Sequence, residues 1–494
     1  MNDVPATRLR EIHRAPVCSD GEFVLYWMTA NRRVRWNFAL QQAVAWCREL
    51  KRPLVVLETL EAEQRWSTTR HHRFVLQGMQ VNARRLRDTP ALYYPYLAAR
   101  SSQVEQLLAV LARRACLVVC DDTPIHERDL APADACADLP VRVEAVDSIG
   151  LLPLHLADRA YPSAYTMRRF LHRRLPDHLM KTPKANPLTR VRLPAAAPLP
   201  ISIVQRWRPI NELLLGQEPR LPRRGAIDGS IEPVDTVGGN QAAEGVLRRF
   251  IRSRLASYAK ERNHPDEDAT SGLAPYLHFG HISPHQIFDG IARHEGWSPD
   301  QLGQRADGQR EGWWGMSESA EAFLDQLVTW RELGYNFCVH RQDYHHYDSL
   351  PEWSRATLGK HARDRREYVY PLKQFEQAAT HDPLWNAAQM QLVREGRIHN
   401  YLRMLWGKKI LEWSASPREA LAVMIDLNNR YALDGCDPNS YSGIFWILGR
   451  YDRPFGPERP VFGKIRYMSS QNTARKLRLQ RFLKRTANSP SDPN

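Results

Sequence analysis

Short apolar runs alternate with amphipathic stretches over the first third of the chain. Four runs have the length and composition of buried strands: Phe23–Met28, Pro53–Leu57, Leu92–Tyr96 and Cys116–Cys120. The stretches between them carry apolar residues at helical spacing, over about Arg33–Lys51, His71–Arg87 and Ser101–Arg114. Continuous apolar strands that alternate with helices predict a parallel sheet covered on both faces. We therefore predict a doubly wound α/β domain over residues 20–150.

The pattern changes twice beyond this domain. Residues 151–239 are rich in Pro and Arg, and they predict a long interdomain connection with short helices such as Tyr165–Arg174. Residues 240–469 contain helical patterns only, including Leu324–Cys338, Leu372–Ala379, Trp385–Glu395 and Ile398–Trp413. They predict an all-α domain. The tail, residues 470–494, is basic and ends in Ser, Pro, Asp and Asn, so we expect it to be partly disordered.

The helix predicted over Ile398–Trp413 carries two indoles on one face. Trp406 and Trp413 are seven residues apart, nearly two whole turns, so the rings should stack about 10 Å apart along the axis. Arg403 lies on a neighbouring stripe of the same helix. This helix is the centre of a region, Thr380–Ser469, in which candidate functional residues are most densely spaced.

Composition narrows the function classes. The chain has 494 residues, with 69 Lys and Arg against 55 Asp and Glu, a net charge of +14. Such an excess favours a polyanionic partner such as nucleic acid, and a merely basic globular protein is the alternative. The seven Cys lack a CxxC pair and no apolar run approaches membrane length, so we expect a cytoplasmic, unsecreted protein.

Two motif searches give weak or negative results. The first strand of the α/β domain is not followed by GxGxxG, which disfavours a nicotinamide dehydrogenase despite the Rossmann-like pattern. His340, His345 and His346 lack a partner Cys or an HExxH motif, so we predict no metal site there.

Basic residues interleaved with aromatic ones suit a DNA-facing rim, with a solvated charged face as the alternative: Arg450, Arg453, Arg459, Lys464 and Arg466 with Tyr451, Phe455 and Phe462.

The C-terminal half resembles a known family. The resemblance rests on five segments: His381–Gln389, Ile398–Trp413, Asp426–Trp446, Asp452–Pro454 and Phe462–Ser469. They are similar to the class II cyclobutane pyrimidine dimer (CPD) DNA photolyases, and a looser similarity extends back to Phe23. The resemblance implies a monomeric lyase with reduced FAD in its helical domain. Its substrate would be duplex DNA containing pyrimidine dimers, and light would drive electron transfer to a flipped-out dimer. The α/β domain would be the antenna domain, with a deazaflavin as a candidate light-harvesting group.

The resemblance assigns cofactor-binding residues. Thr270, Ser271, Gly272 and Leu273 would hold the FAD phosphates, with Tyr258 upstream; from the residues themselves, an ordinary helix N-cap is the alternative. Arg403 and Asp434 resemble the ion pair beside the flavin ring, with Asn400 a neighbouring contact and Asn428 facing flavin N5. A structural salt bridge and a capping Asn are the corresponding alternatives.

The resemblance also assigns catalytic and substrate-binding residues. Trp385, Trp406 and Trp413 match the tryptophan chain that reduces the oxidised flavin, with three core indoles as the alternative. Glu332 resembles the carboxyl group that meets the dimer, with a solvated helix residue as the alternative. Trp446, Met404 and Tyr335 would line the lesion pocket, and Arg453 would contact DNA. Two residues depart from the family pattern: Tyr335, where Trp is expected, and Cys436, where Arg is expected.

Two rival functions remain open at this point. A cryptochrome-like blue-light photoreceptor would share the fold and signal without repairing DNA, although such proteins favour a long C-terminal extension and the tail here is short. A DNA-binding flavoprotein without repair activity would share the cofactor site. Conversion of a dimer under light separates both from a photolyase.

Overall fold

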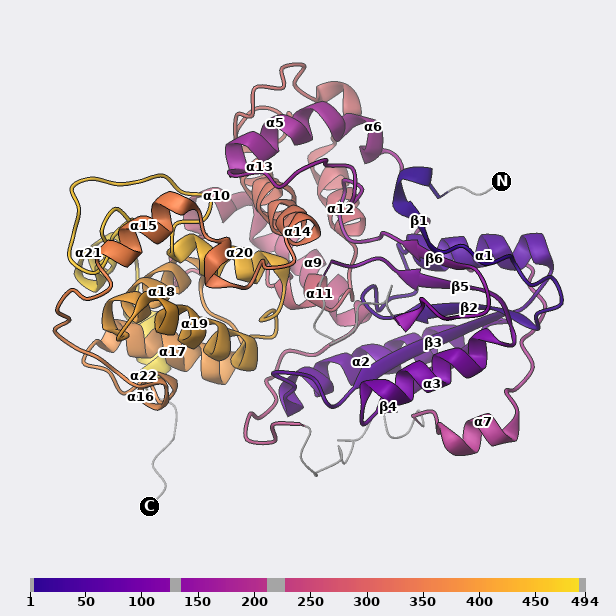
Figure 1. Ribbon diagram of the computed structural model, residues 1–494. Helices are drawn as coiled ribbons and strands as arrows, with labels where there is room; N and C mark the ends of the chain where they lie inside the picture. The colour runs from indigo at the N-terminus through magenta and orange to yellow at the C-terminus, as the bar shows by residue number, and fades with distance from the viewer. Residues whose placement is uncertain (1–3, 125–134, 211–226, 488–494) are drawn as a thin grey trace. The chain divides into compact units, whose positions relative to one another are not determined.

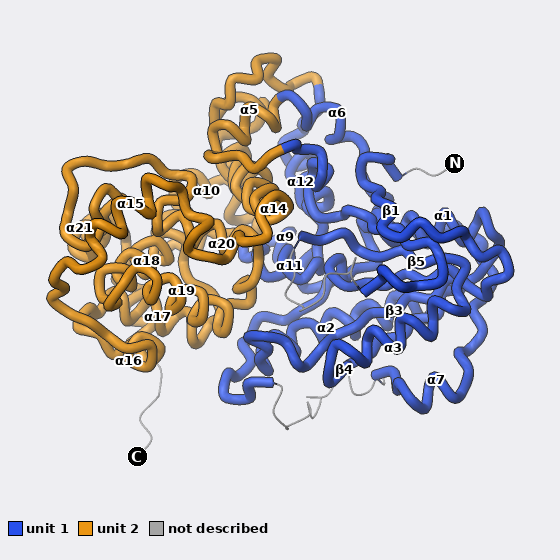
Figure 2. Tube along the Cα trace, in the orientation of Figure 1, with its two compact units in different colours: residues 1–158, 173–249, 272–299 blue, residues 159–172, 250–271, 300–494 orange. Residues whose placement is uncertain are grey.

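The computed structural model describes residues 4–124, 135–210 and 227–487. The chain forms two compact units, which Figure 2 shows in different colours. Unit 1 contains residues 1–158, 173–249 and 272–299, and unit 2 contains residues 159–172, 250–271 and 300–494. These two units do not test the functional domain boundaries of the sequence analysis, which remain a prediction.

A six-stranded sheet forms the centre of unit 1 (Figure 1). The strands are β1 (Leu9–His13), β2 (Phe23–Met28), β3 (Leu54–Glu61), β4 (Leu92–Ala98), β5 (Ala115–Asp121) and β6 (Val143–Val146), in the order β1-β6-β5-β2-β3-β4. Strands β2 to β6 pair in parallel, and β1 pairs antiparallel with β6. The predicted α/β class is therefore confirmed, but the sheet is mixed at one edge.

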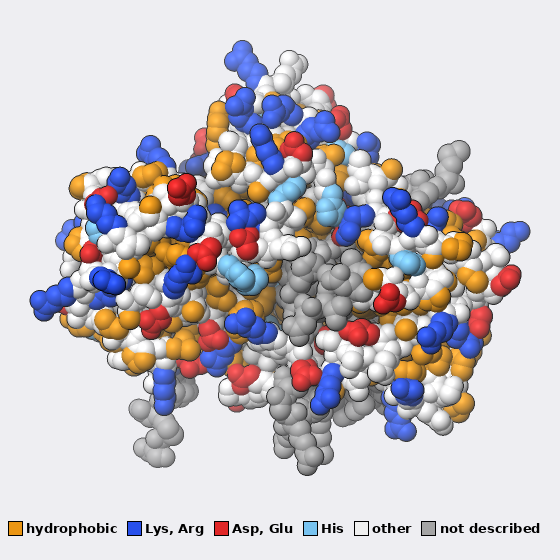
Figure 3. Space-filling view, in the orientation of Figure 1, with side chains coloured by type: hydrophobic (Ala, Val, Ile, Leu, Met, Phe, Trp, Pro, Cys, Tyr) orange, Lys and Arg blue, Asp and Glu red, His pale blue; other side chains and the backbone are white. Residues whose placement is uncertain are grey.

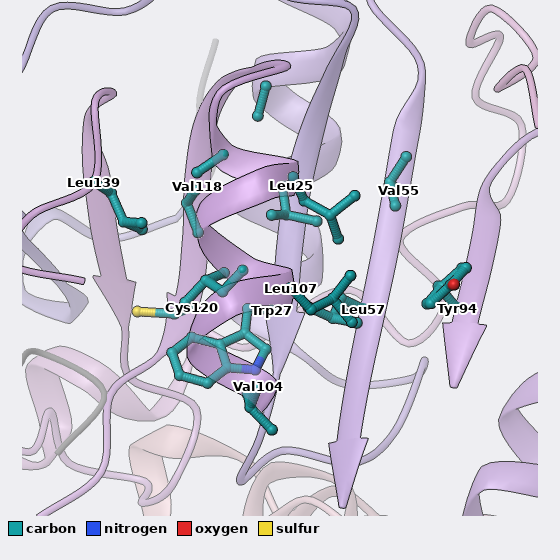
Figure 4. Packing of buried hydrophobic residues seen from close by; sticks show 14 of the residues in the cluster. Leu25, Trp27, Val55, Leu57, Tyr94, Val104, Leu107, Val118, Cys120 and Leu139 are labelled. Carbon is teal, nitrogen blue, oxygen red and sulfur yellow. The ribbon is translucent and has the colours of Figure 1, made fainter. Parts of the chain in front are cut away.

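Helices cover both faces of the sheet. On one face, α1 (Phe38–Leu50) packs on β2, β3 and β5 around Phe38 and Leu40, and the end of α2 (Thr69–Leu86) joins the same cluster. On the other face, α3 (Ser101–Ala112) packs on Leu25, Val55 and Val118 (Figure 4). Trp27 lies within this second cluster and donates a hydrogen bond from Nε1 to Thr59 Oγ1 at 3.1 Å. A buried indole thus has its polar atom satisfied inside the apolar layer.

Strands β1 and β6 were absent from the sequence prediction. Strand β1 is an edge strand in which Arg10 and Glu11 are exposed and the other three residues are half-buried, so it lacks the continuous apolar run of the inner strands. Its start is fixed by Arg8, whose buried guanidinium pairs with Asp147 at 2.9 Å. Strand β6 is only four residues long and contains Glu144. Both depend on long-range partners that hydrophobic periodicity does not show.

Unit 2 is helical. It contains α10 (Tyr258–Glu261), α13 (Glu318–Leu324), α14 (Arg331–His340), α15 (Glu352–Lys360), α16 (Leu372–Glu376), α17 (Pro383–Glu395), α18 (Asn400–Trp413), α19 (Pro417–Tyr431), α20 (Pro438–Ile447), α21 (Ser470–Lys476) and α22 (Gln480–Ala487). Helices α5 (Ala164–Arg174) and α9 (Asn240–Ser253) run across a boundary between the units, while α6 (Pro176–Leu179), α7 (Ile201–Arg206), α11 (Ala274–His278) and α12 (Pro284–Glu295) belong to unit 1.

Three predicted helices of unit 2 differ in detail from the observed ones. The helix expected over Leu324–Cys338 contains a π-helical turn, Asp325–Trp330, between α13 and α14. Helix α16 ends three residues earlier than expected, because Ala378 adopts a left-handed conformation with φ of 54°. Helix α17 begins at Pro383, where the Asp382 side chain accepts a hydrogen bond from the Trp385 amide.

The connection and the tail contain more structure than their composition indicates. The described parts of residues 151–239 carry α5, α6 and α7, and the observed α5 matches the short helix expected at Tyr165–Arg174. The tail forms α21 and α22, and Leu479 and Phe482 pack on helix α17. Residues 488–494, on which the prediction of terminal disorder falls, lie outside the described residues.

Gly280 provides a direct test of packing in unit 1. A Cβ atom there would lie 1.9 Å from the Ala30 carbonyl oxygen, and its φ of 68° disfavours other residues. We predict that Gly280→Ala lowers the free energy of unfolding, measured by urea denaturation, by about 1–3 kcal/mol. Gly245→Ala is the matched control, since that position in α9 faces open space, and it should raise stability by about 0.5–1 kcal/mol. Equal effects of the two substitutions would contradict this packing.

Candidate active site

Helices α18 and α20 approach each other closely at Gly407. A Cβ atom on Gly407 would lie 2.0 Å from Ile447 Cδ1 on α20 and 3.0 Å from Met424 Sδ on α19. Glycine is therefore the residue that allows three helices to meet at this point. The contact places the predicted residues of α18 beside those of α19 and α20.

Arg403, which the sequence analysis predicts to pair with Asp434, lies at this junction. Its guanidinium group is half-buried and lies 3.5 Å from Asp434 Oδ1 and 3.4 Å from Ser440 Oγ. Both contacts are at the long limit for a hydrogen bond, so they engage the guanidinium weakly. The structure thus brings Arg403 and Asp434 together and leaves the guanidinium able to bind another acceptor.

Asn428 is buried on α19 beside this ion pair. Its Nδ2 donates to Gly435 O and Ser440 Oγ, each at 2.9 Å, and lies 3.1 Å from Asn429 Oδ1. The amide nitrogen is therefore fully engaged. Among the described residues none donates to Asn428 Oδ1, so the oxygen is the end of this amide that can accept a further hydrogen bond.

The three predicted tryptophans lie together in the core of unit 2. Trp385 and Trp413 contact each other with ring centroids 5.9 Å apart, and Trp385 Nε1 donates to the Trp406 carbonyl oxygen at 2.9 Å. Trp406 Nε1 donates to Gln389 Oε1 at 2.8 Å. All three indoles are buried. Trp385, from the neighbouring helix α17, thus contacts the ring of Trp413 and the backbone of Trp406, the two tryptophans that the sequence places on one face of α18.

Further aromatic rings continue from Trp413. The His381 ring lies 4.9 Å from Trp413 and stacks on Tyr368 at 3.8 Å, while Tyr370 lies 5.8 Å from Trp413. Tyr368 is 37% exposed, so the run of contacts reaches the surface of unit 2. The Tyr370 hydroxyl and His381 Nδ1 are 2.7 Å apart. Sequence reasoning missed these residues because they lie outside the two helices that carry the tryptophans.

The predicted substrate-facing residues lie on α14, α18 and α20. Glu332 is buried on α14, and Tyr335 on the same helix donates from its hydroxyl to Asp437 Oδ2 at 3.1 Å. Burial and the neighbouring Asp437 raise the pKa of Tyr335 well above its usual value. The hydroxyl therefore stays protonated as a donor. Met404 and Trp446 are half-buried.

Arg453 is exposed beyond the end of α20, and its guanidinium lies 5.6 Å from the Phe455 ring. Basic side chains are spread over the faces visible in Figure 3 and are interspersed with acidic and apolar ones. In this view the net positive charge does not gather in one patch. On this face, charge alone therefore does not locate a surface for nucleic acid.

The predicted phosphate-binding residues precede the short helix α11. Gly272 has a left-handed φ of 71°, Leu273 is buried, and the Thr270 carbonyl oxygen accepts a hydrogen bond from the Arg254 guanidinium at 3.2 Å. Upstream, Tyr258 is buried between Phe250 and Phe323, with ring centroids at 5.7 and 5.4 Å. Asn400 is exposed at the first position of α18. The structure shows where these residues lie, and their role in binding remains a prediction.

Comparisons with known proteins decide the family. No family model matches the chain. The chain is 32% identical over 490 residues to deoxyribodipyrimidine photo-lyase from Methanothermobacter thermautotrophicus, covering 98% of each chain. It is 34% identical over 478 residues to the enzyme of the same name from Potorous tridactylus, covering 95% of this chain and 81% of that one.

The chain belongs to the deoxyribodipyrimidine photo-lyase family. The predicted resemblance to its class II members and the prediction of a lyase acting in DNA repair are confirmed. The fold agrees, since a crystal structure of a bacterial class III photolyase from Agrobacterium tumefaciens has a TM-score of 0.67 over 94% of this chain and 86% of that one, at 17% identity.

Photolyases of this family imply a flavin cofactor, and the residues present fit one. A reduced flavin carries negative charge at one edge of its ring and a proton at N5. Arg403 offers a weakly engaged cation, and Asn428 offers an amide oxygen without a donor among the described residues. Ser440 Oγ accepts from both the Arg403 guanidinium and the Asn428 amide nitrogen. This donor set is suited to an anionic ring that also donates a hydrogen bond.

None of the described helices is long and apolar enough to cross a membrane.

Two residues of the site were missed by sequence reasoning. Ser440 contacts both Arg403 and Asn428, and Gln389 accepts the hydrogen bond of the Trp406 indole. Both are polar residues within helices, where an unremarkable surface position is the default expectation. Gln389 is fully buried, however, and only the fold shows that the helix carrying it faces Trp406. The π-helical turn ending at Trp330 is a further feature without a sequence signal, and such turns are frequent at functional sites.

The hydrogen bond between Gln389 and Trp406 can be tested by substitution. Gln389→Met keeps the side-chain length but leaves the buried Trp406 Nε1 without its acceptor. We predict a loss of about 1–3 kcal/mol in the free energy of unfolding, measured by urea denaturation. Gln377→Met, at an exposed position after α16, is the control and should change stability by less than about 0.5 kcal/mol. A Gln389 variant as stable as the control would show that the Trp406 indole needs no partner.

Proposed function

We propose that this protein repairs cyclobutane pyrimidine dimers in DNA with light, using reduced FAD held by its helical part. The observation that carries the proposal is the similarity, over nearly the full length of both chains, to enzymes named deoxyribodipyrimidine photo-lyase. The Arg403, Asp434 and Asn428 cluster supports it chemically, since these groups suit an anionic flavin. When bound, reduced FAD would supply, on absorbing near-ultraviolet or blue light, the electron that opens the cyclobutane ring.

The residues around the ring would hold it and set its charge. Arg403 would favour the anionic form through its positive charge, and Asp434 would fix the orientation of that guanidinium. Asn428 would accept a hydrogen bond at N5 through Oδ1, because its nitrogen is engaged by Gly435 and Ser440. Asn400 would be a neighbouring contact. Thr270, Ser271, Gly272 and Leu273 would bind the phosphates, with Tyr258 as an aromatic wall.

Other residues would receive the lesion. Enzymes that act on a base inside a duplex take it out of the stack, and photolyases are among them. Trp446 and Met404 would form apolar walls for the flipped dimer, and Tyr335 would add a hydroxyl held by Asp437. Glu332 is buried, so a protonated carboxyl group could donate a hydrogen bond to the carbonyl edge of the dimer. Arg453, exposed beyond α20, would contact the DNA backbone.

The tryptophans would serve reactivation rather than repair. Trp385, Trp406 and Trp413 are buried. The Trp385 ring contacts the Trp413 ring and donates a hydrogen bond to the Trp406 carbonyl oxygen, and aromatic contacts continue from Trp413 through His381 to the exposed Tyr368. An electron could pass along this route from the surface to an oxidised cofactor. The family resemblance also favours a monomer and a deazaflavin as light-harvesting group in the α/β domain.

A repair assay tests the proposal. Purified protein loaded with FAD and chemically reduced is mixed with an oligonucleotide containing one thymine dimer, illuminated, and analysed for restored thymines. We expect conversion under light and none in the dark. Arg403→Ala should lower the yield at least about tenfold, since it removes the cation beside the ring. DNA binding without conversion in the wild type would contradict the proposal and favour a photoreceptor or a non-repairing flavoprotein.

Trp385→Phe separates repair from reactivation in the same assay. With chemically reduced FAD this variant should repair as well as the wild type. With oxidised FAD and an external reductant, light should restore activity in the wild type and at least about tenfold more slowly in the variant, because the route between Trp406 and Trp413 is broken. Loss of repair by the prereduced variant would place Trp385 in the repair step instead.

A further inference from the structure

Lys408 is a fully buried lysine on α18, and its position calls for an explanation. Its exposed fraction is 0%, and Nζ donates to the carbonyl oxygen of Ile447, at the C-terminal end of α20, at 2.6 Å. Among the described residues no carboxylate lies within salt-bridge distance of it. Burying an ammonium group without a carboxylate partner is unfavourable, and the negative end of the α20 dipole offsets the cost only in part.

The ammonium group faces Trp446. Lys408 Nζ lies 5.2 Å from the centre of the Trp446 ring, within the range of a cation–π contact. Arg466 also faces this ring, with Cζ at 5.6 Å, and is paired with Asp452 at 3.1 Å. Two cations and one carboxylate therefore surround Trp446, which leaves one positive charge without compensation.

The other tryptophans of the site have different surroundings. Lys409 Nζ lies 5.4 Å from the Trp413 ring, but it is paired with Glu412 at 2.6 Å, so the charges cancel. Trp385 and Trp406 have neutral partners, a carbonyl oxygen and Gln389, and no cation of the described chain lies over either ring. Trp446 is thus distinguished from the other three indoles by net positive charge.

We infer that the positive charge of Lys408 keeps Trp446 from acting as an electron donor, so that light-driven oxidation is confined to Trp385, Trp406 and Trp413. The inference rests on the proposed function, in which Trp446 lines the lesion pocket. Removing an electron from an indole creates positive charge on the ring, and a nearby ammonium group opposes it. An indole beside the lesion therefore contacts the substrate without supplying electrons in competition with the tryptophan chain.

The charge on Lys408 depends on pH near neutrality. Burial lowers the pKa of Lys408 to about 7, the charge of Asp452 opposes this shift, and that of Arg466 adds to it. Below this pKa the ammonium form dominates, and above it the neutral amine dominates. Protection of Trp446 should therefore be strongest in mildly acid solution and weaken as the pH rises.

One-electron oxidation of the purified protein tests the inference without FAD, DNA or light-driven repair. Photogenerated tris(bipyridine)ruthenium(III) takes one electron from an indole and becomes ruthenium(II), the indole N–H proton passes to water, and dissolved oxygen adds to the resulting radical. Peptide mass spectrometry then gives the oxygenated fraction at each tryptophan. Trp446 is half-buried and so is accessible to this reagent in part.

The measured quantity is oxidation at Trp446 relative to the sum at the other tryptophans except Trp413, at about pH 6 and about pH 8. In the wild type we expect this ratio to rise about threefold or more between the two pH values. Lys408→Met should give the high ratio at both, and Lys408→Arg the low ratio at both. Lys409→Met is the matched control, since it removes the adjacent cation that faces Trp413, and its Trp446 ratio should follow the wild type.

A ratio at Trp446 that is independent of pH in the wild type would overturn the inference, whether or not Lys408→Met folds. A ratio that is equally low in Lys408→Met would also overturn it. The outcome is separable from the proposed function, because a protein that fails to repair dimers but shows the expected pH dependence would overturn the function and leave the charge effect in place.

Discussion

The direct contact of helix α18 with α20 at Gly407 is the constraint on which the candidate site depends. A Cβ atom on Gly407 would lie 2.0 Å from Ile447 Cδ1, so a larger residue at this position would require the Ile447 side chain to move or the two helices to separate. Arg403, Trp406 and Lys408 extend from α18, while Ser440 and Trp446 extend from α20. A wider separation would break the contacts of Arg403 with Ser440 and of Lys408 with Ile447. Packing in the core thus determines the geometry of the polar groups.

Electrostatics then gives neighbouring groups on α18 different roles. Arg403 is half-buried, weakly paired, and therefore available to an anionic cofactor. Lys408 lies five residues further along, is fully buried, and its ammonium group faces an indole. Lys409 is neutralised by Glu412 beside Trp413. Three cations within seven residues of one helix thus differ in burial and pairing, and these differences decide what each can do.

Much of the fold was predictable from hydrophobic pattern. The inner strands of the sheet and the long helices of unit 2 carry continuous or periodic apolar residues, and they appear within a few residues of their expected bounds. Strand β1 was not predictable, because its exposed and half-buried residues form a strand only by pairing with β6, far away in sequence. The π-helical turn before α14 likewise has no signature in apolar periodicity.

The candidate site was predictable only through family resemblance. Spacing alone places Trp406 and Trp413 on one face of α18, but it gives no reason why Trp385 should contact Trp413, because that contact depends on the packing of α17. The pairing of Arg403 with Asp434 spans 31 residues and a turn. Ser440, Gln389 and the aromatic contacts through His381 became apparent only from the fold, since a lone Ser, Gln or His in a sequence has no distinctive pattern.

The central claim is that the junction of α18, α19 and α20 holds a flavin through Arg403 and Asn428. A crystal structure of the protein with bound FAD is the most direct test. The account predicts that the Arg403 guanidinium and Asn428 Oδ1 both lie within hydrogen-bonding distance, about 2.7–3.2 Å, of the isoalloxazine ring. An FAD molecule bound elsewhere on the chain, or a ring that contacts neither residue, would contradict it.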